Sequence, residues 1–222
     1  MNGVVLLSGG MDSSTLLAHC IDAFPDGRHY AISFDYGQRH RRELNAAADI
    51  ARYFNTPHQI ADLRSVGRDF MFGSSQTSMI PVPQGHYTDD SMRVTIVPNR
   101  NMVMLSIATA FAIASHSDFV GYAAHAGDHA IYPDCRPEFV TAMGEAIRLC
   151  DDHKVSIYTP YIDLTKAQIL EEGLYRNVPY QLTWTCYEGL SFPCGKCGTC
   201  VERAEAFELN KQGDPLLQGG PA

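Results

Sequence analysis

Short apolar runs along the chain are separated by longer stretches in which apolar residues recur at the spacing of a helix. A short run bounded by turn residues predicts a buried strand, and the longer pattern predicts an amphipathic helix. We expect strands at 4–7, 29–34, 58–61, 119–122 and 156–159. We expect helices at 13–23, 38–54, 100–115, 137–150 and 166–172. Strands that alternate with helices favour an α/β fold with a doubly wound, mostly parallel sheet and flanking helices.

Residues 64–98 interrupt this alternation. The segment is rich in Gly, Ser, Pro and Met, and Pro81, Pro83 and Pro98 lie within it. Long connections of this kind are usually functional, so we expect an excursion over the site that serves as a lid or an oligomer contact. Residues from Gln212 onward are expected to be frayed.

The first predicted strand is followed directly by a short loop with two glycines, Gly9 and Gly10. Glycines let the backbone turn sharply, and the helix that follows presents free N–H groups, which together favour anion binding. The hydroxyls of Ser8 and Ser13 add donors. An ordinary strand-to-helix turn is the alternative, but Asp12 favours a phosphate site because an acid beside a phosphate usually shares a Mg²⁺ ion.

The second predicted strand ends at the same edge of the sheet, with Ser33, Phe34 and Tyr36. Ligands of doubly wound sheets lie beyond the carboxyl ends of the strands, near a topological switch point. We therefore expect Phe34 or Tyr36 to pack on a bound base while backbone groups read its edge. Core packing is the alternative for Phe34.

Length and charge limit the class of function. The chain has 222 residues and a formal net charge of −8, which argues against a broad contact with nucleic-acid phosphates and favours a small-molecule substrate. No apolar stretch approaches the roughly 18 residues of a membrane span, and the first apolar run lacks the charged flank of a signal peptide. We therefore expect a cytoplasmic protein with no nucleic-acid or membrane partner.

Cysteines are concentrated near the end of the sequence, in a C-x7-C-x2-C-x2-C pattern. Four thiolates in a short span suit tetrahedral Zn²⁺ in a closed, structural site. An iron–sulfur cluster is the competing interpretation, and disulfides are a weaker third. The predicted ligands are Cys186, Cys194, Cys197 and Cys200. The remaining cysteines, Cys20, Cys135 and Cys150, are expected to be buried thiols.

Lys166 follows Thr165, which is placed to cap the helix predicted at 166–172. A lysine at the start of a helix is unfavourable unless an anion lies nearby, so a polyphosphate contact is one interpretation. A surface lysine is the other.

The string SGGMDSS at residues 8–14 is similar to the SGGxDSS loop of the PP-loop ATP pyrophosphatases, whereas the Walker pattern is absent. More of the chain resembles one branch of that superfamily, the 7-cyano-7-deazaguanine synthase family of the queuosine precursor pathway. The strings that carry this resemblance, in chain order, are SGGMDSS, SFDYGQRH, VPNRN, GDHAIYPDCRPEF, LTKAQI and the four-cysteine pattern. They extend over almost the whole sequence.

This resemblance implies an adenine nucleotide α-hydrolase-like fold, a PP-loop ATP-pyrophosphatase domain at 1–180 and a small zinc-binding region and tail at 181–222. It also implies ATP, Mg²⁺, structural Zn²⁺ and a homodimer. The implied ATP-binding residues are Ser8, Gly9, Gly10, Met11, Asp12, Ser13, Ser33, Phe34 and Tyr36. The implied substrate-binding residues are Arg100, Asp128, Tyr132, Asp134, Arg136 and Phe139.

The implied reaction is an ATP-dependent ligation. The carboxylate of 7-carboxy-7-deazaguanine attacks the α-phosphorus, pyrophosphate leaves, and ammonia displaces AMP to give an amide. A second adenylation and loss of AMP give the nitrile. The carboxylate and the phosphate repel each other, so Lys166 and Arg100, with Mg²⁺ at Asp12, are the candidates that supply positive charge.

The sequence departs from the family pattern between His125 and Ile131. His125 and His129 are candidates for a general base and for contacts with the substrate, or are loop histidines bonded to backbone. The departure leaves open a paralogue that joins the same acyl-adenylate to another amine, for example on a protein. A PP-loop tRNA-modifying enzyme and a non-catalytic nucleotide sensor are further alternatives.

Overall fold

The computed structural model describes residues 1–39, 41–86 and 90–218. In this part of the chain, five parallel strands form one sheet in the order β3-β2-β1-β4-β5. The strands are β1 (Gly3–Leu6), β2 (His29–Asp35), β3 (His58–Asp62), β4 (Phe119–Gly121) and β5 (Ser156–Tyr158). The predicted doubly wound parallel sheet is confirmed.

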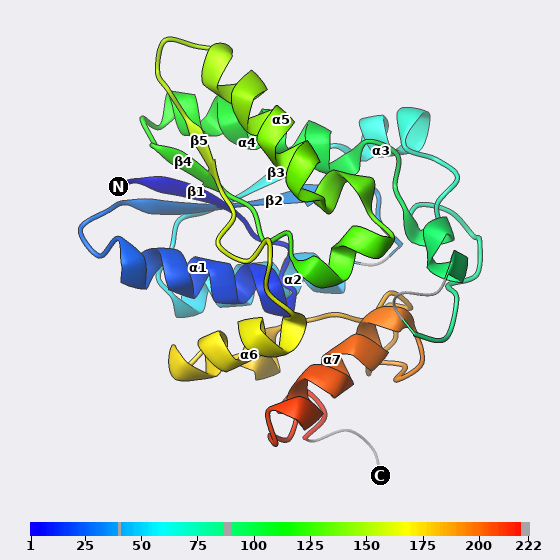
Figure 1. Cartoon of the computed structure of the whole chain (residues 1–222). Coiled ribbons are helices and arrows are strands. Elements are labelled where there is room, and N and C mark those ends of the chain that lie inside the picture. Colours follow the sequence, from blue (N-terminus) through cyan, green and yellow to red (C-terminus); the bar gives the residue numbers. More distant parts are fainter. Residues whose placement is uncertain (40, 87–89, 219–222) are drawn as a thin grey trace.

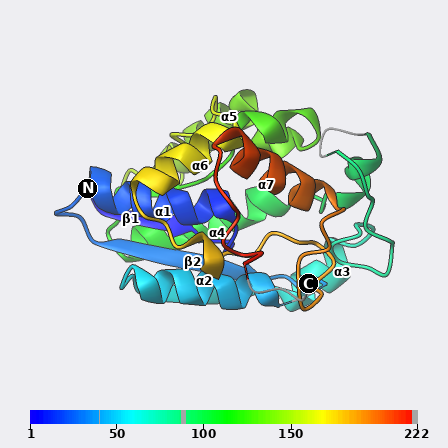
Figure 2. The same ribbon diagram turned by 90° about the horizontal axis from the view of Figure 1, so that it is seen from below.

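Helices cover both faces of the sheet, with α1 and α2 on one face and α4 and α5 on the other (Figure 1). Helix α6 packs against α1, and α7 packs against α6; Figure 2 shows both helices from below. The helices are α1 (Met11–Ala23), α2 (Arg42–Tyr53), α3 (Arg64–Phe70), α4 (Arg100–Ala114), α5 (Pro137–Leu149), α6 (Lys166–Tyr175) and α7 (Gly198–Leu209). Short 3-10 turns are η1 (Asp90–Thr95), η2 (Ala126–Ala130), η3 (Pro133–Cys135) and η4 (Tyr180–Leu182). None of these helices is long and apolar enough to cross a membrane.

Strand β1 is buried on both faces, as expected for the centre of a parallel sheet. Val4 packs in the apolar cluster under α4 and α5, and its neighbour Val5 packs in the cluster under α1 and α2. Both side chains are fully buried. The centre of the sheet is therefore covered on both faces, and the carboxyl ends of its strands are left to form a site.

The sheet has its switch point beside β1. The chain leaves β1 toward β2 on one side and later returns to place β4 on the other side. The loops that follow β1 and β4 therefore separate and leave a crevice at the carboxyl end of the sheet. This is the edge at which the sequence predicts a nucleotide.

The helix predicted at 38–54 begins later, at Arg42. Gln38 explains the difference because its side-chain amide closes the preceding turn. Its Nε2 donates to the Phe34 carbonyl at 3.1 Å, and its Oε1 accepts from the Tyr36 N–H at 3.0 Å. His40, part of one resembling string, lies outside the described residues.

The segment 64–98, predicted as an excursion, contains α3 and η1. The expectation for the tail is wrong. The tail is docked rather than frayed over residues 212–218, because Asp214 accepts two hydrogen bonds from the buried guanidinium of Arg203, at 2.7 and 2.9 Å. Helix α7, which carries Arg203, is not predicted by the apolar pattern.

Candidate active site and metal centre

The loop between β1 and α1 is shaped by Gly9, whose φ is +82°. A Cβ at this position would lie 2.3 Å from the carbonyl oxygen of Glu43, so the loop packs directly on the first turn of α2. The Ser8 hydroxyl accepts from the Gly10 N–H at 3.2 Å and lies 3.0 Å from the Ser13 hydroxyl. The loop is therefore held rigid with the free N–H groups of α1 beside it, an arrangement that suits a phosphate.

A cavity opens at this loop, in the crevice between the ends of β1, β2 and β4. Many of the residues predicted from the sequence line it together. They are Ser8, Gly10, Met11, Asp12, Ser13, Ser33, Phe34, Tyr36, Arg100, Asp128, Tyr132 and Lys166. Gly9 lies behind the loop, against α2.

Lys166 stands between two carboxylates at one end of this cavity. Its Nζ lies 2.5 Å from Glu202 Oε2 and 3.3 Å from Asp12 Oδ2. Burial acts to lower the pKa of Lys166, but the negative charges of Asp12 and Glu202 raise it above its usual range. Burial likewise acts to raise the pKa of Asp12, and Lys166 lowers it in net effect. Lys166 and Asp12 are therefore both charged at neutral pH.

The start of α6 sets the place of Lys166. Thr165 caps this helix by accepting from the Gln168 N–H, and the Gln168 side chain accepts in return from the Thr165 N–H, a complete capping box. The predicted cap is confirmed. A lysine at the start of a helix is stabilised by a nearby anion, and here the anions are the carboxylates of Asp12 and Glu202. The sequence does not predict the contact with Glu202.

His125 is buried beside the same carboxylates, with 1% of its side chain exposed. Its Nδ1 accepts from the Gly127 N–H at 3.1 Å, so we assign the ring proton to Nε2. Nε2 lies 3.5 Å from Asp128 Oδ2 and 3.7 Å from Asp12 Oδ2. The ring therefore presents a proton to the two acids rather than a lone pair.

Asp12 offers an oxygen suited to a cation. Its Oδ1 is buried and has no hydrogen-bond partner among the described residues. The carboxylates of Asp12, Asp128 and Glu202 face a single lysine charge, so this end of the cavity carries excess negative charge. Carboxylate oxygens are the protein ligands that Mg²⁺ prefers, so the residues present fit that ion.

Several residues proposed for the substrate lie outside the cavity wall. Arg136 donates from Nε to the His129 carbonyl at 2.9 Å, and Phe139 packs at the edge of the core. Asp134 Oδ2 accepts from the Asn101 N–H at 3.3 Å, at the start of α4. These residues shape the wall from behind rather than line it, as far as the described chain shows.

The sequence does not predict several other residues that line the cavity. Among them, Glu43 is a carboxylic acid whose ionisation is altered at this site. Burial raises the pKa of Glu43 to about 7, although Arg100 and a hydrogen bond with Gln38 act in the opposite direction. Glu43 follows a run of arginines in the sequence, a pattern typical of a solvated helix face, so the sequence gives no sign that Glu43 lines the cavity. Further missed residues on the wall are Gln38, Asn101, Tyr122, Cys135, Trp184, Tyr187 and Arg203.

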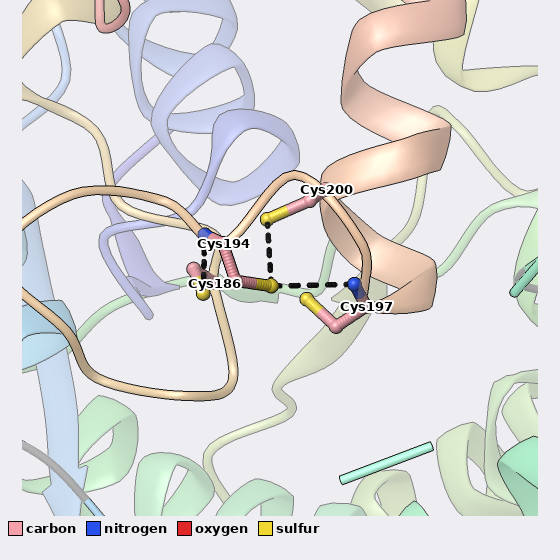
Figure 3. Close-up of side chains that lie close together, drawn as sticks. All are labelled: Cys186, Cys194, Cys197 and Cys200. Atoms are coloured by element: carbon pink, nitrogen blue, oxygen red, sulfur yellow. Dashed lines mark hydrogen bonds between the residues drawn. The ribbon is translucent and has the colours of Figure 1, made fainter. Parts of the chain in front are cut away.

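The four predicted cysteines come together at the start of α7 (Figure 3). Their sulfur atoms all lie within 4.8 Å of one another, close to the separation of about 3.8 Å that a tetrahedral ion with Zn–S bonds near 2.3 Å requires. The N–H groups of Lys196 and Cys197 donate to Cys194 Sγ at 3.4 and 3.3 Å. This spacing fits a single tetrahedral ion. Of the other cysteines, Cys20 and Cys135 are buried as predicted, but Cys150 is exposed.

Comparisons with known proteins agree with this geometry. Residues 2–211 match the model of a family described as queuosine biosynthesis protein QueC. The chain is 50% identical over 213 residues to a 7-cyano-7-deazaguanine synthase of Pseudoalteromonas translucida, covering 96% of each chain. It is 52% identical over 213 residues to that of Marinobacter nauticus, covering 96% of this chain and 95% of the relative.

Solved structures share the fold at low sequence identity. An NH3-dependent NAD synthetase from Campylobacter jejuni matches with a TM-score of 0.51 and 15% identity, over 99% of this chain and 78% of that one. A U34-tRNA thiolase from Methanococcus maripaludis, solved with its [4Fe-4S] cluster, matches with a TM-score of 0.53 and 15% identity, over 100% of this chain and 67% of that one. These likenesses establish the architecture alone.

The cysteine geometry predicts one metal ion per chain. Elemental analysis of purified protein is expected to give a single metal equivalent, and Cys197→Ser should lose it and lower the free energy of unfolding by several kcal/mol. The exposed Cys150→Ser is the matched control and should retain the metal. Four irons with inorganic sulfide in each chain would contradict the single-ion site.

Glu43 predicts a pH-dependent stability. Its pKa of about 7 in the folded chain exceeds the ordinary 4.5, so the folded state binds the extra proton between these values and loses stability as the pH rises through them. In urea denaturation, the stability of Glu43→Gln relative to wild type should increase by about 1–2 kcal/mol between about pH 5 and about pH 8. The exposed Glu208→Gln should show no such trend, and a flat difference for Glu43→Gln would refute the buried carboxyl.

Proposed function

This chain belongs to the QueC family of queuosine biosynthesis proteins, whose curated members are 7-cyano-7-deazaguanine synthases, and from that premise we propose that it is an ATP-dependent ligase. It adenylates the carboxylate of 7-carboxy-7-deazaguanine and couples the activated acid to ammonia. The observation that carries the proposal is the Lys166–Asp12 pair, 3.3 Å apart, beside a glycine loop at the switch point of the sheet.

The cavity has a place for each part of ATP. The N–H groups of the loop at 8–13 receive the pyrophosphate end, because a helix N-terminus with a glycine turn binds anions. Asp12 and Asp128 would hold Mg²⁺, which neutralises phosphate charge when bound. The end of β2 contributes Ser33, Phe34 and the following Tyr36 to the wall for the adenine.

Two fixed cations address the central difficulty of the reaction, which is to bring one anion against another. Lys166 lies at the loop, and Arg100 projects from the start of α4 into the same cavity. Placed around the α-phosphorus, they stabilise the charge that develops as the carboxylate attacks and pyrophosphate leaves. Both are held by the fold before substrates arrive, so little reorganisation is required.

Ammonia then displaces AMP and gives the amide, and a second adenylation of the amide oxygen followed by loss of AMP gives the nitrile. His125 is proposed to orient Asp12 and Asp128 through its Nε2 proton rather than to act as the base. The departure from the family pattern leaves the cavity wall unchanged at two positions, because Ile131 is buried in the core and His129 is not among the described residues that line the cavity. Ammonia is therefore retained as the proposed acceptor.

The remaining parts of the proposal concern the setting of the enzyme. Zn²⁺ is the ion proposed for the four cysteines because four thiolates in a closed tetrahedron suit it. Free thiolates and ATP favour the cytoplasm. A homodimer is supported by exposed apolar side chains in the segment 64–98: Phe70, Phe72 and Met79 are 75%, 68% and 89% exposed. The domain boundary after residue 180 stays a prediction.

Asp12 provides the test of the proposal. Purified protein given ATP, Mg²⁺, 7-carboxy-7-deazaguanine and ammonium is expected to release pyrophosphate and form the nitrile. A coupled enzymatic assay measures the pyrophosphate, and mass spectrometry identifies the nitrile. Asp12→Asn should lower the rate by about 100-fold or more, because it removes a carboxylate proposed to hold the Mg²⁺ ion that neutralises the reacting phosphates. Asp26→Asn, in an exposed turn, is the control. Full activity in Asp12→Asn, or no pyrophosphate from wild type, would refute the proposal.

A further inference from the structure

Glu202 is a buried acid whose place in the chain links the two centres. It follows Cys200 by two residues in α7, the helix that begins within the cysteine cluster with Cys197 as its N-cap. Its side chain is 13% exposed. It is not among the described residues that line the cavity, so it reaches the site only through Lys166.

The two oxygens of the Glu202 carboxylate have different neighbours. Oε2 lies 2.5 Å from Lys166 Nζ. Oε1 lies close to Gly127 in η2, where a Cβ added to the glycine would approach it to 2.8 Å. The carboxylate therefore lies between α6 and the turn that carries Asp128.

Helix α7 has little freedom to move relative to this contact. Two of the four sulfur ligands, Cys197 and Cys200, belong to its N-cap and first turn. One residue after Glu202, the Arg203 guanidinium donates to Asp214 and to the Tyr180 carbonyl. The metal cluster and this buried ion pair together fix the rotation and the height of α7, and so the position of Glu202.

We propose that Glu202 is a positioning residue for Lys166, and that the four-cysteine site is coupled to the active site through it. A lysine ammonium is a point charge on a flexible stem. Glu202 holds that charge on one side, so that Asp12 is shared between the lysine and a cation instead of closing on the lysine alone. The role of Lys166 at the phosphates rests on the proposed function, whereas the coupling itself rests on geometry.

The kinetic test compares Glu202→Gln with Glu208→Gln, an exposed glutamate on the same helix. Glu202→Gln keeps the shape and removes the charge, so kcat for pyrophosphate release should fall by about 10- to 100-fold while KM for ATP stays within about 3-fold. Metal content and the unfolding midpoint should match those of Glu208→Gln. Wild-type kcat in Glu202→Gln, or loss of its metal, would overturn the positioning role.

A second test reads Lys166 directly and needs no substrate. The sequence has four lysines, Lys154, Lys166, Lys196 and Lys211, so reductive methylation can be followed at each by mass spectrometry. Lys166 should react faster in Glu202→Gln than in wild type. It should also react faster in wild type stripped of metal by a chelator than in metal-loaded wild type. The methylation rate of Lys154 should be the same in all three samples. An unchanged rate at Lys166 in either case would overturn the coupling, whatever the outcome of the activity assay.

Discussion

The ammonium of Lys166, held between Asp12 and Glu202, is the interaction on which the site depends. It ties together the loop after β1, the start of α6 and the helix α7, three segments that are far apart in the sequence. Each partner is fixed independently: Asp12 by the rigid glycine loop, Lys166 by its capping box, and Glu202 by the cysteine cluster. The parallel sheet provides the frame, because its central strand is covered on both faces and its carboxyl edge faces the cavity.

Nearby cations explain how several carboxylates can lie close together around Lys166. Asp12 and Asp128 line the cavity near Lys166, and Glu202 contacts the same lysine from outside the lining. Acids packed this closely are stable only when cations share them, which suits the proposed Mg²⁺ as well as Lys166 and Arg100. Within the described chain, Asp12 Oδ1 is buried without a hydrogen-bond partner, so it is the oxygen best placed to receive such a cation.

The sequence predicts the parts of the molecule that local patterns encode. Apolar runs predict the strands, the glycine pair predicts the tight loop after β1, Thr165 predicts the start of α6, and cysteine spacing predicts the cluster of four cysteines. What it does not reveal depends on tertiary contacts. Glu202 and Glu43 look like ordinary surface acids of helices until folding buries them, and His125 looks like a general base until the Gly127 N–H takes its Nδ1. The docked tail depends in the same way on a single partner, Arg203, on a helix that the apolar pattern does not predict.

The central claim is that the acid itself attacks the α-phosphorus of ATP, and an isotope of oxygen tests this directly. When both carboxylate oxygens of 7-carboxy-7-deazaguanine carry the heavy isotope, AMP recovered from the reaction should contain one heavy oxygen, in each of the two rounds that lead to the nitrile. Mass spectrometry of the AMP and the pyrophosphate measures the distribution. Heavy oxygen in the pyrophosphate, or its absence from AMP, would contradict adenylation of the carboxylate.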